Sequence, residues 1–155
     1  MISQRARYAF KAVVALARAK PGEGMQIKQL CEQEKLPRKF LEQILLTLKA
    51  AGYISSRRGR DGGYEILKAP AQIMIGPMLR AVDGPIAPLP CLSRTAYRRC
   101  DDCQDEAACE LRIAFDKAYS DYLATLEHLS LADIMRKSDA AAPGRHPTGL
   151  QPITA

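Results

Sequence analysis

Three short amphipathic segments, followed directly by a glycine-rich hairpin, constrain the fold of this chain more than any other feature. Apolar residues at helical spacing predict helices over residues 5–19, 27–34 and 37–50. Two β-prone runs, 53–55 and 64–67, then flank a basic tip with three glycines, which is typical of a β-hairpin. Three helices and a hairpin in this order predict a winged helix-turn-helix, and a different small helical domain is the alternative.

The third segment carries the clearest helix signals. Lys35 and Leu36 fit a turn before it, and Pro37 fits the start of a helix because its missing N–H is not needed there. Gly52 fits the C-terminal end. The expected buried positions repeat at i, i+3, i+4 and i+7 and are Leu41, Ile44, Leu45 and Leu48. The apolar positions expected in the first segment are Phe10, Val13, Val14 and Ala17.

The composition excludes several classes of protein. Apolar residues make up 47% of the 155 residues, which is enough for a buried core and argues against a disordered chain. Aromatic residues make up 6%, without tryptophan, which argues against a stacking surface for single-stranded nucleic acid. No apolar stretch approaches the roughly 18 residues of a membrane span, and the N-terminus lacks an apolar signal segment. We therefore expect a cytoplasmic protein.

Positive charge is concentrated in the first part of the chain. Residues 1–68 hold 14 Lys or Arg against 6 Asp or Glu, whereas residues 69–138 hold 8 against 10. A basic region followed by a mildly acidic one indicates that the first binds a polyanion, with nucleic acid favoured. A solvated basic surface without a partner is the alternative.

In a helix-turn-helix, side chains near the start of the second helix reach base edges in the major groove. The candidates here are Arg38, Lys39, Glu42 and Gln43. Arg and Lys suit guanine, Gln suits adenine and Glu suits cytosine. The hairpin tip would be repulsive unless phosphate or a minor groove neutralises its arginines, which are Arg57, Arg58 and Arg60. Lys28 is a further candidate for a phosphate contact. For the polar residues at the start of the third helix, the alternative is an ordinary solvated helix end without a DNA contact.

The remainder of the chain is divided into three parts. A linker helix over 73–83, with a weak point at Gly76-Pro77, leads into a loop rich in proline and cysteine, and together they occupy 69–109. A long helix from about 106 to 128 and a short helix that starts at residues 130–133 follow. We expect these helices to form a dimerisation region over 110–137 and the tail, 138–155, to be disordered.

The long helix has an apolar stripe with spacings of 4, 3, 4 and 3, which is a heptad pattern. The stripe consists of Phe115, Tyr119, Tyr122, Leu126 and Leu129. No other expected element could cover its whole length of about 30 Å. We expect a helix–helix homodimer, and packing of the stripe on its own domain is the alternative.

Four cysteines are clustered in the loop: Cys91, Cys100, Cys103 and Cys109. Thiolates are soft ligands, so a zinc ion or an iron–sulfur cluster is expected, and the spacing does not separate the two. Unbound thiols, or a redox disulfide between Cys100 and Cys103, are the alternatives. Cys31 lies on an apolar helix face and is expected to be a small core residue.

Several stretches together resemble a known family. These are RARYAFKAVVALA, LPRKFLEQILLTLKAAGYISSRRGRDGGYEILKAP, AVDGPIAP, and the long helix from Cys109 to LSLADI. They are similar to the Rrf2 family of bacterial winged-helix regulators, which includes the IscR, NsrR and RirA types. The resemblance covers about residues 3–135. It implies a homodimer joined through the long helix, a palindromic operator in double-stranded DNA, and often a 2Fe-2S or 4Fe-4S cluster.

The resemblance also assigns residues. The cluster ligands would be Cys91, Cys103 and Cys109; Lys39 and Glu42 would lie near bases; and Arg58 and Arg60 would lie in the wing. The interval between Cys91 and Cys103 is longer than the family's usual spacing. Arg112 and Arg7 stand where family branches have a His or an acidic fourth ligand. Cys100, Asp101, Asp102 and Asp105 are the candidates for that ligand.

We therefore expect a DNA-binding transcriptional regulator that senses iron, iron–sulfur or redox status through the cysteine loop. The alternative keeps the DNA function and replaces the cluster by a thiol switch or by structural zinc. An enzyme is not expected, since the chain has no glycine-rich phosphate loop and no Ser/His/Asp set. A pure interaction module would leave the basic wing unexplained.

Overall fold

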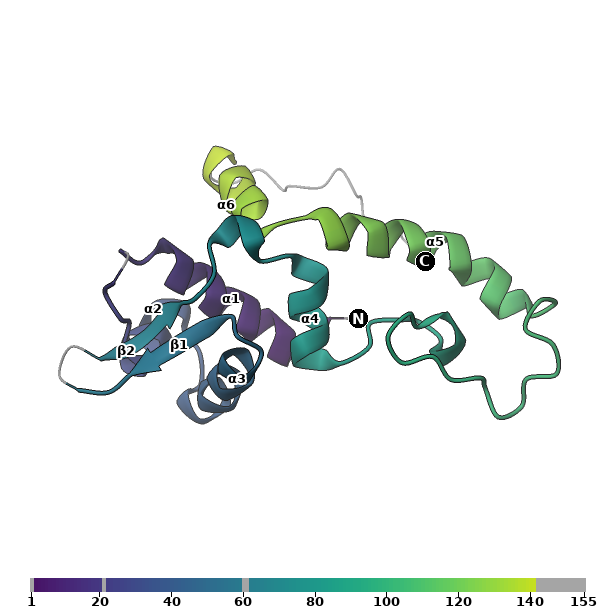
Figure 1. The fold of residues 1–155 in the computed structure, drawn as a ribbon, viewed down its shortest axis with the longest axis horizontal. Helices are drawn as coiled ribbons and strands as arrows, with labels where there is room; N and C mark the ends of the chain where they lie inside the picture. Colours follow the sequence, from purple (N-terminus) through teal and green to yellow (C-terminus); the bar gives the residue numbers. More distant parts are fainter. Residues whose placement is uncertain (1, 21, 60–61, 142–155) are drawn as a thin grey trace.

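The structure, a computed structural model, describes residues 2–20, 22–59 and 62–141. Within these ranges the chain is mainly helical, with one small hairpin and two short 3-10 helices, η1 and η2 (Figure 1). In chain order the elements are α1 (Gln4–Arg18), α2 (Ile27–Glu34), α3 (Arg38–Ala50), β1 (Ile54–Arg57), β2 (Gly63–Ile66), η1 (Pro70–Gln72), α4 (Ile75–Asp83), η2 (Pro90–Leu92), α5 (Glu110–His128) and α6 (Leu131–Ala140). The predicted winged helix-turn-helix is confirmed.

The core of the winged domain forms around α1 and α3. The four apolar positions predicted for α3, from Leu41 to Leu48, are all fully buried. In α1 the four predicted apolar positions all face the core: Val13 is fully buried, and Phe10, Val14 and Ala17 are partly buried against it. The fully covered face consists of Ala6, Ala9, Ala12, Val13, Ala15 and Leu16. Small alanines allow α1 to approach its neighbours closely, which a search for large apolar residues misses.

The wing, residues 54–66, is an antiparallel hairpin with Ile54 opposite Ile66. Met25 adds a single bridge to its second strand, because Met25 and Tyr64 exchange backbone hydrogen bonds of 2.8 and 2.9 Å. The backbones approach so closely here that a Cβ on Gly63 would lie 2.7 Å from the carbonyl oxygen of Met25. Position 63 therefore requires glycine, because any side chain would clash with the backbone of Met25.

The linker helix α4 packs against α1, α3 and α5. The weak point predicted at Gly76-Pro77 is not a break, because both residues lie in the first turn of α4, where a missing N–H is tolerated. The chain segments around Met74 and Ser130 also form a bridge, with Ile75 N donating to Leu129 O and Leu131 N donating to Ile73 O. The short helix predicted to start at residues 130–133 is α6, and the Ser130 side chain caps it.

The long helix α5 projects from the winged domain, and the cysteine loop, residues 84–109, extends beside it from α4 to its distant N-terminal end (Figure 1). The helix starts at Glu110, later than residue 106, with Cys109 as its N-cap residue. At the other end of the chain, α6 continues to Ala140, so the tail predicted from 138 begins too early; residues 142–155 lie outside the described part. No described helix has the length and apolar character needed to cross a membrane.

The heptad stripe predicted on α5 is divided between two environments. Tyr119 is buried with Leu92 and Leu123, while Leu126 and Leu129 pack on the main core. Phe115 and Tyr122 are 45% and 42% exposed. The whole stripe is therefore not free for a partner, because three of its five residues pack on their own chain.

Candidate DNA-binding surface and cysteine loop

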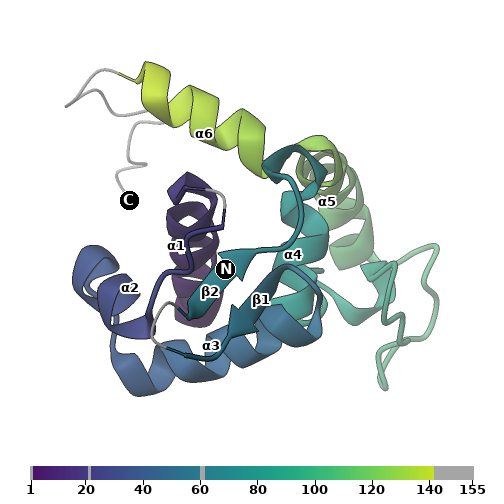
Figure 2. The same ribbon diagram turned by 60° about the vertical axis from the view of Figure 1, so that its left-hand side comes forward.

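The first turns of α3 present the predicted base-contacting side chains on the face opposite the core. Arg38, Lys39 and Gln43 are exposed and Glu42 is half-buried; we call these four residues the reading face. The turn before α3 is closed by Lys35 in the left-handed conformation, with Leu36 buried beside it. This turn holds α2 against α3 and leaves the start of α3 uncovered (Figure 2).

Two of the cations predicted on the helices already have acidic neighbours. Arg38 Nε donates to Glu42 Oε1 at 3.1 Å, so two residues of the reading face form an ion pair. Lys28 Nζ lies 4.0 Å from Glu32 Oε1 on the exposed side of α2. Exposed i,i+4 pairs of this kind contribute only about 0.3–0.5 kcal/mol and can exchange for phosphate or base contacts.

The wing arginines differ from one another. Arg57 donates to both carboxylate oxygens of Glu65 on the opposite strand, at 2.9 and 2.5 Å, and Ser55 Oγ adds a bond of 2.9 Å. The hydrogen bonds from Arg57, and to a smaller extent the bond from Ser55, lower the pKa of the Glu65 carboxyl group. Arg58 is exposed and forms no ion pair with another described residue. Arg60 lies outside the described residues.

Sequence reasoning missed Lys49. Its Nζ donates to Ser56 Oγ on β1 at 2.6 Å and so links the last turn of α3 to the wing. The signal was available, because Lys49 is a cation in the last turn of the helix that leads directly into the first strand of the predicted hairpin. Arg5 makes a second link, from α1 to Thr47 Oγ1 at 2.7 Å. These contacts fix the position of α3 relative to the wing and to α1.

The cysteine loop brings the four predicted cysteines to the walls of one pocket of about 380 Å³. Cys91 is buried, and Cys100, Cys103 and Cys109 are half-buried. Burial raises the pKa of the Cys100 thiol, and the adjacent Cys91 thiol raises it further. Asp102 and Asp105 also line the pocket, along with Glu106 and Arg112. Cys31 packs against the main core instead, as predicted.

Two guanidinium groups hold the backbone of this pocket. Arg112, in the first turn of α5, donates to the carbonyl oxygen of Cys91 at 2.6 Å. Arg99 donates to the carbonyl oxygens of Cys103 and Gln104 at 3.0 and 2.8 Å. Arg112 therefore binds the loop backbone beside the thiols. The Rrf2 resemblance would place a fourth ligand at this position in one branch of the family.

The pocket has the donor chemistry of a thiolate-ligated metal site but not its closed geometry. Four thiols and nearby carboxylates suit an iron–sulfur cluster or zinc. Among the residues that the structure describes, no three His, Cys, Asp or Glu side chains are arranged to hold one metal ion. The residue types therefore fit such a group, and the thiols would have to converge further to ligate it.

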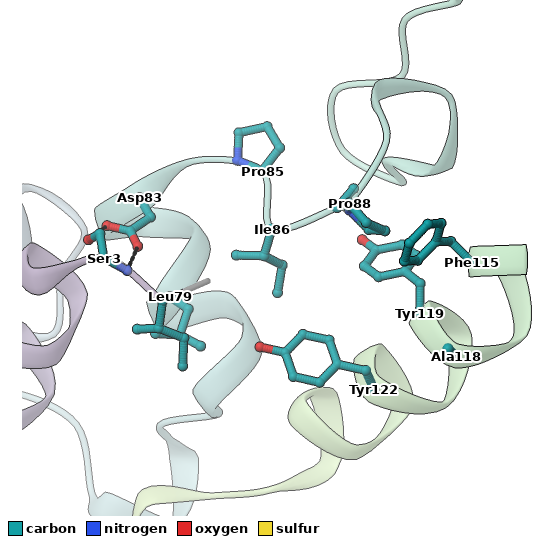
Figure 3. A pocket seen from close by; sticks show the side chains of 12 residues that line it. Ser3, Leu79, Asp83, Pro85, Ile86, Pro88, Phe115, Ala118, Tyr119 and Tyr122 are labelled. Atoms are coloured by element: carbon teal, nitrogen blue, oxygen red, sulfur yellow. Dashed lines mark hydrogen bonds between the residues drawn. The ribbon is translucent and has the colours of Figure 1, made fainter. Parts of the chain in front are cut away.

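A second hollow, of about 650 Å³, lies between α5 and the ends of α1 and α4 (Figure 3). Its walls are largely apolar and include Leu79, Ile86, Phe115 and Tyr122. One rim is closed by Ser3, whose hydroxyl donates to Asp83 at 2.6 Å. The partly exposed side of α5 thus forms one wall of an apolar groove.

A family model described as that of an iron-dependent transcriptional regulator, Rrf2, matches residues 2–137. The chain belongs to the Rrf2 family. A Rhodobacter capsulatus protein, named as an rrf2-like HTH-type transcriptional regulator, is 46% identical over 145 residues, which are 92% of this chain and 97% of the relative. The regulator NsrR of Geobacillus kaustophilus is 28% identical over 128 residues, or 83% and 84% of the two chains.

Solved structures of Rrf2-type regulators share the fold. The structure of CymR, titled the global cysteine regulator of B. subtilis, has a TM-score of 0.68 at 27% identity and covers 88% of this chain and 97% of its own. The structure of IscR from T. potens has a TM-score of 0.70 at 23% identity and covers 93% of each chain. This Rrf2-family chain is therefore a winged-helix transcriptional regulator, and its family and relatives are regulators and not enzymes.

Proposed function

We propose that this regulator binds a palindromic operator in duplex DNA as a homodimer, with its affinity set by the state of the cysteine loop. The observation that carries the DNA part is the uncovered reading face of α3 beside a basic wing. The side chains that would reach base edges are Arg38, Lys39, Glu42 and Gln43. Lys28, Arg57, Arg58 and Arg60 would contact phosphates or the minor groove.

The homodimer is supported by the apolar groove along α5. Leu111, Phe115 and Tyr122 lie at helical spacing, and all three are at least 42% exposed. With Ala118 they form a stripe, which we call the α5 stripe, beside the groove. A second copy would present the same stripe, so a two-fold contact can bury both. The two-fold axis of such a dimer would match the two half-sites of a palindrome.

The sensing part is supported by the pocket that all four loop cysteines line. Cys91, Cys103 and Cys109 would hold an iron–sulfur cluster, with Cys100 or an aspartate of the loop as the fourth ligand. Such a cluster responds to oxygen, iron supply or redox poise. Arg112 and Cys109 connect the pocket walls directly to the first turn of α5. A rearrangement of the thiols would therefore shift the start of the helix that carries the α5 stripe.

The same helix reaches the winged domain at its other end. Glu127, in the last turn of α5, accepts a hydrogen bond from Arg80 on α4, and the neighbouring Leu126 packs on the main core, which also contains Tyr53. Tyr53 is the buried residue immediately before β1. Movement of α5 thus has a continuous packed route to the wing. A change of a few kcal/mol in the balance between two arrangements would change operator occupancy.

The test is to purify the full chain without oxygen, record its visible spectrum and select binding sites from random duplex DNA. Brown protein, a palindromic selected sequence and different affinities before and after exposure to air would support the proposal. Colourless protein with stoichiometric zinc, or a Cys100–Cys103 disulfide after mild peroxide, would replace the cluster with the alternative sensors. Absence of selective duplex binding would overturn the DNA function itself.

A further inference from the structure

One large apolar side chain in the middle of α3 has no place in the core. Leu46 is 58% exposed, whereas Leu45 and Leu48 on the same helix are completely buried. The described residues that pack in the main core, or partly against it, do not include Leu46. Its apolar surface therefore contributes little to the stability of the monomer.

The position of Leu46 on the helix is specific. Lys39, Glu42, Gln43 and Leu46 stand at i, i+3, i+4 and i+7, so they follow one another along a single side of α3. This is the spacing with which the reading helix of a homeodomain contacts base edges. In Figure 2, α3 runs along the edge of the domain, and its neighbouring elements all lie on the inner side. Leu46 thus continues the reading face by one further turn.

The chemistry of Leu46 selects among the groups that a major groove offers. A leucine side chain neither donates nor accepts a hydrogen bond, so it gains nothing from the polar edges of guanine, adenine or cytosine. The apolar group on the floor of the groove is the 5-methyl group of thymine. Lys39 and Lys49 are both exposed on α3, one before and one after Leu46, and these cations favour a polyanion over an apolar protein partner.

We propose that Leu46 is a specificity-determining residue that contacts a thymine methyl group in each operator half-site. The inference rests on the proposed function, since it requires α3 to lie in the major groove. It predicts an A·T pair at a fixed place in each half-site. This pair lies next to those read by Lys39 and Glu42, in the direction in which α3 runs towards its C-terminus. Leu46 selects this pair by excluding water from the methyl group.

The test uses the full chain and duplexes selected by the wild-type protein. Each thymine of the selected site is replaced in turn by uracil, which removes only the methyl group. One position in each half-site should then weaken wild-type binding by roughly three- to five-fold, as expected for one buried methyl group. Leu46→Ala should bind the original operator more weakly by a similar factor, and it should no longer distinguish thymine from uracil at that position.

Leu67→Ala is the matched control, because Leu67 is 59% exposed and follows β2, outside the reading helix α3. It should retain the full response to uracil. Thermal unfolding should show that Leu46→Ala is folded, since alanine is a better helix former at an exposed position. Wild-type binding that is insensitive to uracil at every thymine would overturn the role of Leu46 while leaving duplex binding intact. If uracil weakened binding of Leu46→Ala as much as that of the wild type, the role of Leu46 would also be overturned. A wild-type protein that selects no duplex sequence would overturn the proposed function as well.

Discussion

Arg80 on α4 donates a hydrogen bond to Glu127 on α5, and the resulting ion pair joins the linker helix to the long helix. The side chains of both residues are less than one-third exposed. The helices approach closely here, because a Cβ on Gly76 would lie 2.8 Å from Glu127 Oε1. This ion pair, together with the backbone bond from Ile75 to Leu129, holds α5 to the helix that packs on the winged domain.

Removal of either charge should destabilise the protein. Arg80→Gln leaves the partly buried carboxylate of Glu127 without its cation, and we expect a loss of about 1–3 kcal/mol in the free energy of unfolding. Urea denaturation measures this change. The control is Lys117→Gln, which removes an exposed i,i+4 ion pair with Asp121 and should cost less than about 0.5 kcal/mol. Equal costs for the two variants would show that the α4–α5 pair has no special role.

The same pair should make stability depend on pH in the acid range. The hydrogen bond from Arg80 lowers the pKa of Glu127 below its ordinary value. Because the folded-state pKa is the lower one, this stabilisation is complete above the ordinary glutamate pKa of about 4.3 and disappears as the pH falls through the folded value. Wild-type stability should therefore fall more steeply than that of Glu127→Gln between about pH 5 and pH 3. If the free energy of unfolding of the two proteins fell in parallel with pH, the lowered pKa of Glu127 would be contradicted.

The wing offers a variant that should strengthen DNA binding. Glu65 holds the guanidinium of Arg57 in two hydrogen bonds and places a negative charge beside a predicted phosphate contact. Glu65→Gln should free Arg57 and raise the affinity for duplexes of any sequence. The slope of log affinity against log salt should steepen by up to about 0.9. Arg58→Ala should have the opposite effect on both quantities. Unchanged affinity in Glu65→Gln would place Arg57 away from DNA.

The parts of the fold that follow from local spacing were predictable. The repeat from Leu41 to Leu48 is incompatible with any element other than a helix, and the glycines at the wing tip require a tight turn. The partnership of Arg57 with Glu65 could also have been derived. Ser55 faces Glu65 across the hairpin, and Arg57 is two residues further along the same side.

Other features depend on contacts between distant segments and have no local signal. The spacing of apolar residues on α5 does not reveal which of two sides its own domain will cover. Tyr119 and Leu123 are buried in the monomer, while Tyr122 is left exposed. The single-residue bridge of Met25 to the wing likewise carries no periodic pattern. The cysteines were recognised by their clustering, but their convergence on one pocket depends on where the loop folds back against α5.

A charge on the α5 stripe should dissociate the homodimer. Tyr122→Glu would place a carboxylate in the expected interface and cost several kcal/mol of association free energy. Analytical ultracentrifugation should then show a monomer that binds a palindrome weakly. Lys117→Glu provides the control, because Lys117 is exposed on a different side of α5. A Tyr122→Glu protein that remains dimeric with full DNA affinity would move the interface elsewhere.

The cysteine loop gives the sharpest test of the sensor, because its thiols can be exchanged one at a time. Cys91→Ser, Cys103→Ser and Cys109→Ser should each abolish the colour of anaerobically purified protein, since a serine hydroxyl is a poor ligand for iron in such a cluster. Cys100→Ser should abolish it only if Cys100 is the fourth ligand, and should spare it if an aspartate of the loop serves instead. Cys31→Ser should leave the colour intact, because Cys31 lies against the main core, outside the loop. Colour that survives all four loop substitutions would exclude the pocket as the cluster site.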